Sequence, residues 1–215
     1  MSSFVSDLEQ LKTERLAPIL AAGQLSLDGD ATGDPVALLQ VALANEIGVS
    51  ELAATWMPST PEVDVKIAFA RQAGDEANHF KLVESRLSAL GVDLAAWTPP
   101  PDNPLFAYLA KLPTTVERIA AGLVTLESIA YGVNENFMAL CAARGDDETV
   151  AIYRKYIQPD ERAHQQLGQQ LLAKYAITEA QQATARATVI RVLEIAATAR
   201  AKAAAKLGTA CFPGC

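Results

Sequence analysis

Turn-forming residues cluster at a few points in this 215-residue chain. In sheet proteins such residues recur at short intervals, so the long stretches between the clusters favour helices. The composition agrees, because half of the residues are apolar, alanine is abundant and only 6% of the residues are aromatic. We therefore predict an all-α fold, and the length requires no more than a single domain over residues 1–215.

Breaks and helix-start signals divide the chain into long helical segments. Four long helices are expected, over about 35–56, 61–90, 113–144 and 146–175. A proline-rich connection over 95–104, followed by a short helix over about 105–112, would join the second to the third. Two hairpins with a longer crossover between them predict a four-helix bundle with its core over about 35–175.

Two further helices would pack outside this bundle, one N-terminal over about 3–20 and one C-terminal over about 178–207. Pro18 is expected to bend or end the first of them, with a loop following from residue 23. Pro159 is expected to produce a kink or bulge just before Glu161.

Charge and the N-terminal sequence exclude several classes of protein. The net charge of -7 and the pI of about 4.9 disfavour binding to nucleic acid. Charged residues interrupt the first 20 positions, which fits neither a secretory signal nor a transit peptide. No stretch is expected to approach the continuous apolar length that spans a bilayer. A cytoplasmic protein is the expectation.

Both histidines of the chain lie three residues after a glutamate, as Glu76/His79 and Glu161/His164. Positions i and i+3 share a face of a helix, so each pair can present a carboxylate and an imidazole to the same metal ion. One such pair is more often a surface ion pair. Two pairs that use every histidine, on two different long helices, predict a metal site.

Glu46 and Glu127 complete the candidate ligand set. Each lies amid apolar residues at helical spacing on one of the other two long helices. Burying an unpaired carboxylate is costly, and a metal pair supplies the compensating charge. Four glutamates and two histidines are the ligands of two-metal carboxylate sites in helical bundles.

In their longer form, Asp75-Glu76-x-x-His79 and Asp160-Glu161-x-x-His164, the motifs resemble those of the ferritin-like di-iron carboxylate superfamily, as found in bacterial hydrocarbon monooxygenases and related oxidases. The resemblance covers about residues 35–175. It implies a ferritin-like bundle and two iron ions, with manganese, alone or paired with iron, also accepted. It further implies that Asp75 and Asp160 support the histidines. Asn78 and Ala163 stand where an arginine often precedes the histidine of monooxygenases.

The resemblance implies an oxidoreductase that activates dioxygen to oxidise a small, apolar substrate, supplied with electrons by a donor protein. One alternative is iron oxidation or storage, as in bacterioferritin-like and rubrerythrin-like proteins, although the extra helices and the proline-rich connection argue against it. A second alternative is a helical interaction module with no chemistry. The extent of exposed helix is compatible with a homodimer.

Three residues near the candidate ligands have two interpretations each. Tyr131 is either a tyrosine that assists the metals or an ordinary core residue. Glu135 is either a further metal ligand or a proton relay, or it is a polar residue at one end of the bundle. Gly168 either leaves room for substrate or oxygen, or permits close packing of helices.

The chain has three cysteines, too few for the disulfide framework of a small secreted protein. Cys141 is expected to be a small apolar core residue. Cys211 and Cys215 are expected to belong to a flexible end, with a disulfide loop, a thiol relay or a soft-metal site as alternatives.

Overall fold

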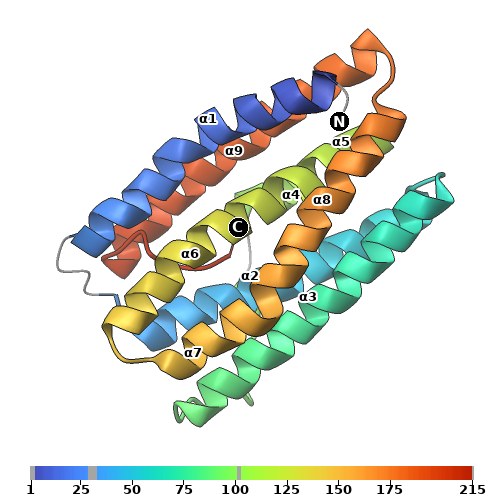
Figure 1. Ribbon diagram of the computed structural model, residues 1–215. Helices are drawn as coiled ribbons and strands as arrows, with labels where there is room; N and C mark the ends of the chain where they lie inside the picture. Colours follow the sequence, from blue (N-terminus) through green and yellow to red (C-terminus); the bar gives the residue numbers. More distant parts are fainter. Residues whose placement is uncertain (1–2, 29–32, 101–102, 215) are drawn as a thin grey trace.

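The computed structural model describes residues 3–28, 33–100 and 103–214, and every secondary-structure element in these ranges is helical (Figure 1). The all-α prediction is therefore confirmed. Two of the elements, η1 and η2, are π-helical. In chain order the elements are α1 (Ser3–Asp28), α2 (Pro35–Ser59), α3 (Val63–Ala89), α4 (Pro104–Leu109), α5 (Thr115–Arg118), η1 (Ile119–Leu126), α6 (Glu127–Ala143), α7 (Asp147–Ile152), η2 (Tyr153–Ile157), α8 (Gln158–Tyr175) and α9 (Glu179–Leu207).

Side-chain caps set several of the helix starts. The carboxylate of Asp34 accepts a hydrogen bond from the backbone N–H of Val36, and Pro35 fills the first turn of α2. Thr114 and Thr178 form capping boxes at the starts of α5 and α9. These short-range signals are visible in the sequence, and the helix starts that they predict are confirmed.

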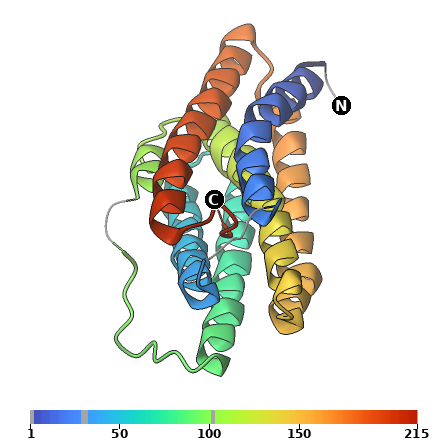
Figure 2. The same ribbon diagram turned by 90° about the vertical axis from the view of Figure 1, so that its left-hand side faces the viewer.

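The helices form a bundle covered on one side by α1 and α9 (Figures 1 and 2). Within it α2 packs on α3, α3 on α8, and α8 on both η1 and α6. The outer pair contacts this bundle through α1 on α6 and α9 on η1, and α1 also packs on α9. The N- and C-terminal helices, predicted to pack outside a four-helix bundle, lie together on this one side.

The N-terminal helix is longer than predicted. α1 continues through Pro18 to Asp28, so the expected end near residue 20 and the loop from residue 23 are wrong. Pro18 and Glu14 are both exposed, and the Glu14 carbonyl that the proline leaves without a donor can bind water. Beyond the proline, Asn136 of α6 donates a hydrogen bond to the Leu20 carbonyl at 3.0 Å. Packing against α6 therefore maintains the helix that local sequence would end.

Two π-helical segments interrupt long helices, each starting within the first two turns or so after the helix begins. The helix expected to be unbroken over 113–144 contains η1, in which the Thr125 hydroxyl donates to the Ala120 carbonyl at 2.6 Å. η2 ends at Ile157, so the bulge expected before Glu161 is confirmed. Pro159 has no N–H to donate to the carbonyl four residues earlier, which lies in η2. Each π-helical segment immediately precedes a helix that carries predicted ligands.

The expectation of a flexible end is wrong for Thr209–Gly214. Cys211 and Phe212 are 0% and 3% exposed, and the Cys211 thiol donates to the Gly23 carbonyl at 3.0 Å. Cys215 lies outside the described residues. Cys141 is buried as predicted, and burial raises the pKa of its thiol to about 12.

α2 bears on the expectation that no stretch approaches the apolar length of a membrane span. Over an 18-residue window its mean hydropathy is 1.4, enough in length and composition for a helix that crosses a membrane. Half of that window is buried inside the protein. Core helices of soluble proteins pass the same test, so this stretch is weak evidence for a membrane span.

Candidate metal centre

The six predicted ligands come together in the middle of the bundle. α2 contributes Glu46, α3 contributes Glu76 and His79, α6 begins with Glu127, and α8 contributes Glu161 and His164. All six are less than 5% exposed. They form two groups in which the ligand atoms lie within 4.8 Å of one another: Glu46, Glu76, His79 and Glu161; and Glu76, Glu127, Glu161 and His164. Glu76 and Glu161 belong to both groups.

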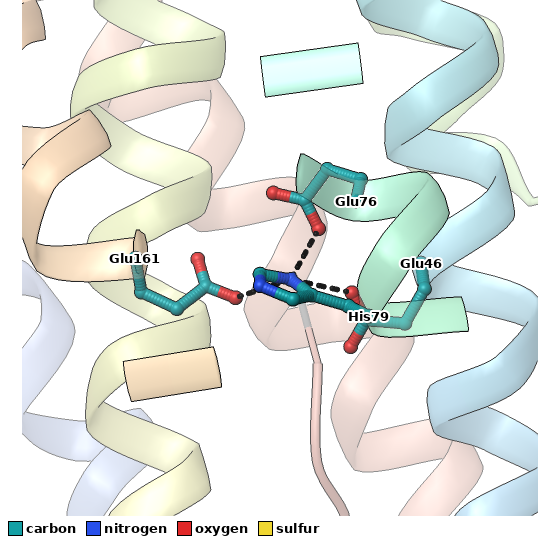
Figure 3. Close-up of side chains that lie close together, drawn as sticks. All are labelled: Glu46, Glu76, His79 and Glu161. Carbon is teal, nitrogen blue, oxygen red and sulfur yellow. Dashed lines mark hydrogen bonds and ion pairs between the residues drawn. The ribbon is translucent and has the colours of Figure 1, made fainter. Parts of the chain in front are cut away.

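The first group surrounds one imidazole, as Figure 3 shows. Nδ1 of His79 lies 3.2 Å from Glu76 Oε2 and 3.5 Å from Glu46 Oε2. Glu161 Oε1 approaches the same nitrogen from α8 at 4.0 Å. Three carboxylates from three helices thus converge on one ring nitrogen.

The second group repeats the arrangement around His164. Its Nδ1 lies 3.5 Å from Glu76 Oε1 and 3.5 Å from Glu127 Oε1. Glu76 therefore directs one carboxylate oxygen toward each histidine, which is the geometry of a carboxylate shared between two ions.

The outer nitrogens of the histidines bind aspartates of the opposite motif. Nε2 of His79 on α3 lies 3.3 Å from Asp160 Oδ2 on α8, and Nε2 of His164 on α8 lies 2.9 Å from Asp75 Oδ2 on α3. With the proton on Nε2, each Nδ1 is left facing the glutamates as an acceptor. The resemblance implied that the aspartates support the histidines. In the structure each aspartate contacts the histidine of the other motif.

Burial dominates the electrostatics of the glutamates. It raises the pKa of Glu46 to about 8, against the opposing effect of His79. Burial, reinforced by the nearby Glu127 and Glu76, raises the pKa of Glu161 well above its usual value. For Glu76, burial again opposes the charged form, but the two neighbouring imidazoles outweigh it and lower the pKa.

The histidines balance this negative charge. Burial disfavours the imidazolium form of each, but Glu46 and Glu76 outweigh burial and raise the pKa of His79 to about 11. Glu127, with Glu76, likewise raises the pKa of His164 to about 11. Protons thus supply the positive charge that this cluster of carboxylates demands, and metal ions would replace those protons.

Several buried polar atoms of the cluster have no hydrogen-bond partner among the described residues. They are Glu76 Oε1, Glu161 Oε2 and His164 Nδ1. The 3.5 Å approach of Glu76 Oε1 to His164 Nδ1 is an ion-pair distance without hydrogen-bond geometry. Buried polar atoms are almost always paired, so unpaired oxygen and nitrogen atoms within this cluster of carboxylates and imidazoles indicate a site for cations. The donor set of imidazoles and carboxylates fits a pair of transition-metal ions.

Gln72 was not identified from the sequence. It is 1% exposed, and its Nε2 donates a hydrogen bond to Glu127 Oε1. The signal was its position one turn before Glu76 on α3, which places both side chains on the same inward face. An amide that holds a ligating carboxylate fixes the direction in which the carboxylate points.

Tyr153 in η2 was also missed. Its ring is 1% exposed, its hydroxyl has no partner among the described residues, and burial, with Glu46 and Cys141 nearby, raises its pKa well above the usual value. Nothing in its local sequence distinguishes it from the other tyrosines. Its burial depends on the packing of η2 against Phe137, 5.2 Å away between ring centroids.

The structure shows where Tyr131, Glu135 and Gly168 lie, for each of which the sequence allowed two interpretations. Tyr131 and Glu135 line a separate cavity of about 440 Å³, and neither belongs to the candidate metal groups. Glu135 is exposed and accepts a hydrogen bond from Gln158. A Cβ on Gly168 would lie 2.7 Å from the Leu123 Cβ, so this glycine permits close helix packing.

Comparison of the chain with family models, with curated proteins and with solved structures found no match. What the site can do is therefore inferred from its own residues and geometry.

Proposed function

We propose that the protein is a ferritin-like di-iron carboxylate oxidoreductase that uses dioxygen to oxidise a small, apolar substrate. The observation that supports this is the sharing of Glu76 and Glu161 between two ligand groups, each with its own histidine. Two overlapping groups with shared carboxylates suit two neighbouring ions better than one.

Each ion would have ligands from both halves of the chain. Glu46, Glu76 and His79 would hold one, and Glu127, Glu161 and His164 the other, with Glu76 or Glu161 shared between them. Two ferrous ions held in this way would supply electrons for the reduction of dioxygen. Iron suits mixed imidazole and carboxylate donors, and manganese would also be accepted.

The protein's own residues orient the ligands and exclude water. Asp75 and Asp160 fix the two imidazoles, and Gln72 fixes Glu127. The cavity beside the glutamates has a volume of only about 10 Å³, and Val49, Leu126 and Ala130 line it together with the glutamates. It has room for about one water-sized molecule, so these apolar residues keep bulk water from the reacting centre.

Metal content tests this proposal directly. The protein is loaded anaerobically with ferrous iron, freed of excess metal, and its iron per chain is counted before oxygen uptake is followed. We expect about two ions per chain, as the two ligand groups require, with oxygen consumed in step with iron. Glu161→Ala should lose metal. Glu135→Ala, an exposed glutamate on the neighbouring helix, should keep both ions and serves as the control.

Each alternative has its own outcome in the same preparation. Iron oxidation for storage would give many more than two ions per chain and a multi-subunit shell. A helical interaction module would bind no metal either as isolated or after loading, with unchanged stability, and this result would overturn the proposal.

A further inference from the structure

A groove of about 750 Å³ runs along the outer side of α2, within the size range of small-molecule sites. Its lining is mainly apolar and comes from α2, the connection after α3, α4 and the end of α9. Representative lining residues are Val41, Ala44, Trp97, Phe106 and Leu207. The groove therefore offers an apolar molecule a binding surface outside the metal centre.

Asn45 connects this groove to the metal centre. Its side chain is 7% exposed and borders both the groove and the small cavity beside the glutamates. It directly precedes Glu46, a candidate ligand. Asn45 thus lies between the apolar groove and the cavity beside the glutamates.

The segment Thr209–Gly214, here called the 209–214 segment, also lies between the groove and the candidate metal site. After α9 the chain turns back toward the middle of the molecule (Figures 1 and 2). There Asn45 of α2 donates to the Pro213 carbonyl at 3.5 Å, and the Gly214 N–H donates to Asn134 of α6 at 3.1 Å. Gly214 also borders the cavity beside the glutamates.

Gly214 lines the cavity beside the glutamates and has no side chain that would fill it. Its φ of +80° is in the left-handed region, and a Cβ there would lie 2.5 Å from Nδ2 of Asn45. A side chain would therefore be strained and would push Asn45 away. The residue at the boundary between groove and cavity has to be glycine.

The 209–214 segment is held by side chains and has no helical structure of its own. Arg200 donates to the carbonyls of Phe212 and Gly214 at 2.7 and 2.6 Å, and its guanidinium lies 3.9 Å from the centroid of the Phe212 ring. Cys211 and Phe212 belong to the hydrophobic core, so the segment opens only when water replaces the bonds to its backbone and these two side chains are displaced.

We propose that the groove along α2 binds the apolar substrate and that the 209–214 segment is the gate between this groove and the metal cavity. This inference rests on the proposed function, because it places the substrate of that function. The substrate's apolar body lies in the groove, and its reacting end passes Asn45 when Pro213 and Gly214 move away.

Cys211 is a natural reporter of the gate, because it lies within the 209–214 segment and is fully buried. Metal-free protein is treated with N-ethylmaleimide, and the rate at which Cys211 is alkylated is measured by peptide mass spectrometry. Octanoate serves as the probe because its chain is apolar and its head is small. We expect octanoate to speed alkylation roughly threefold or more by shifting the gate toward its open state, and acetate to have no effect.

Matched variants locate the route. Ala44→Trp fills the groove and should abolish the octanoate effect, and Ala37→Trp, another lining position, replaces it if that variant does not fold. Gln166→Trp places the same bulk in the separate cavity beside Arg154 and should leave the effect intact. Asn134→Ala removes the bond to Gly214 and should speed alkylation without octanoate.

An unchanged alkylation rate with octanoate would overturn the gate, as would an effect abolished by Gln166→Trp and not by the groove variants. The readout needs no metal. Failure to bind iron would therefore contradict the proposed function alone. A protein that binds iron but whose Cys211 alkylation rate does not change with octanoate would contradict the gate alone.

Discussion

His164 on α8 and Asp75 on α3 are joined across the bundle, with 2.9 Å between Nε2 and Oδ2. Asp75 contributes no atom to either candidate metal group, yet it determines which nitrogen of His164 faces the glutamates. The same relation, reversed, joins His79 to Asp160.

Asp75→Asn should therefore weaken metal binding about 10- to 100-fold, the usual effect of removing the carboxylate behind a ligating histidine. Competition with a chromophoric chelator measures the affinity. Asp64→Asn is the control, because Asp64 is also on α3 but binds Lys174 and Tyr175, away from the histidines. Equal losses in both variants would show that Asp75 acts only through general stability.

Glu161→Leu should bind less metal and yet make the metal-free protein more stable. Glu161 is fully buried among other carboxylates, and Oε2 has no hydrogen-bond partner among the described residues. Replacing buried ionic groups with apolar ones often stabilises a protein by about 1–4 kcal/mol. Urea unfolding in the presence of a chelator measures the change. Glu135→Leu, at an exposed position, should show no such gain. A less stable Glu161→Leu protein would argue against a site organised around metal.

Gly168→Ala should destabilise the protein by about 1–3 kcal/mol, the usual cost of overpacking. The new Cβ would lie 2.7 Å from the Leu123 Cβ and 2.9 Å from the Leu123 carbonyl carbon, and backbone cannot easily yield. Gly74→Ala on α3 is the matched control, because a Cβ there meets nothing within 4 Å. It should stabilise by about 0.5–1 kcal/mol. Thermal unfolding of the two variants should shift in opposite directions.

Asp146 should make the free energy of unfolding depend on pH in the acidic range. Partial burial opposes its charged form, but hydrogen bonds from Thr149 and the charge of Arg86 outweigh burial and lower its pKa below 3.8. A lowered folded-state pKa means that the stabilisation is complete above 3.8 and is lost as the pH falls through the folded value.

Asp146→Ala should accordingly cost about 0.5–2 kcal/mol near neutral pH, because Asp146 also caps α7. The difference from the native protein should shrink as the pH falls below 3.8, the unperturbed value. Denaturant unfolding at a series of pH values measures it. Asp147→Ala, exposed in the same turn, should cost less. A cost that stays constant down to the lowest pH would contradict the role of the charge.

The six residues of the candidate metal site could be found from the sequence because each depends on helical spacing. Glu76 and His79 share a face by their separation alone, and Glu46 and Glu127 are conspicuous as charges inside apolar stripes. Helix starts were equally accessible, since Asp34 and Thr178 act on residues within one turn.

Features that depend on distant contacts could not be predicted. α1 passes Pro18 because α6, more than a hundred residues later, packs against it. The 209–214 segment is buried because Arg200, Asn45 and Asn134 bind its backbone, and no local pattern of Cys-Phe-Pro-Gly indicates those partners. Asp75 and Asp160 each contact the histidine of the other motif, and this too requires α3 and α8 to be packed against each other.

The π-helical segment η1 lets the helix before Glu127 hold an extra residue without turning Glu127 away from the candidate site. A π-helical turn accommodates one residue more than an α-helical turn, so η1 behaves as a helix that has absorbed an insertion. Had the same residue been added to a helix that stayed α-helical throughout, everything after it would have rotated by about 100°. Glu127 would then point away from His164 although all six candidate ligands were still present. The π-helical form therefore separates the length of this helix from the direction of the side chain that follows it.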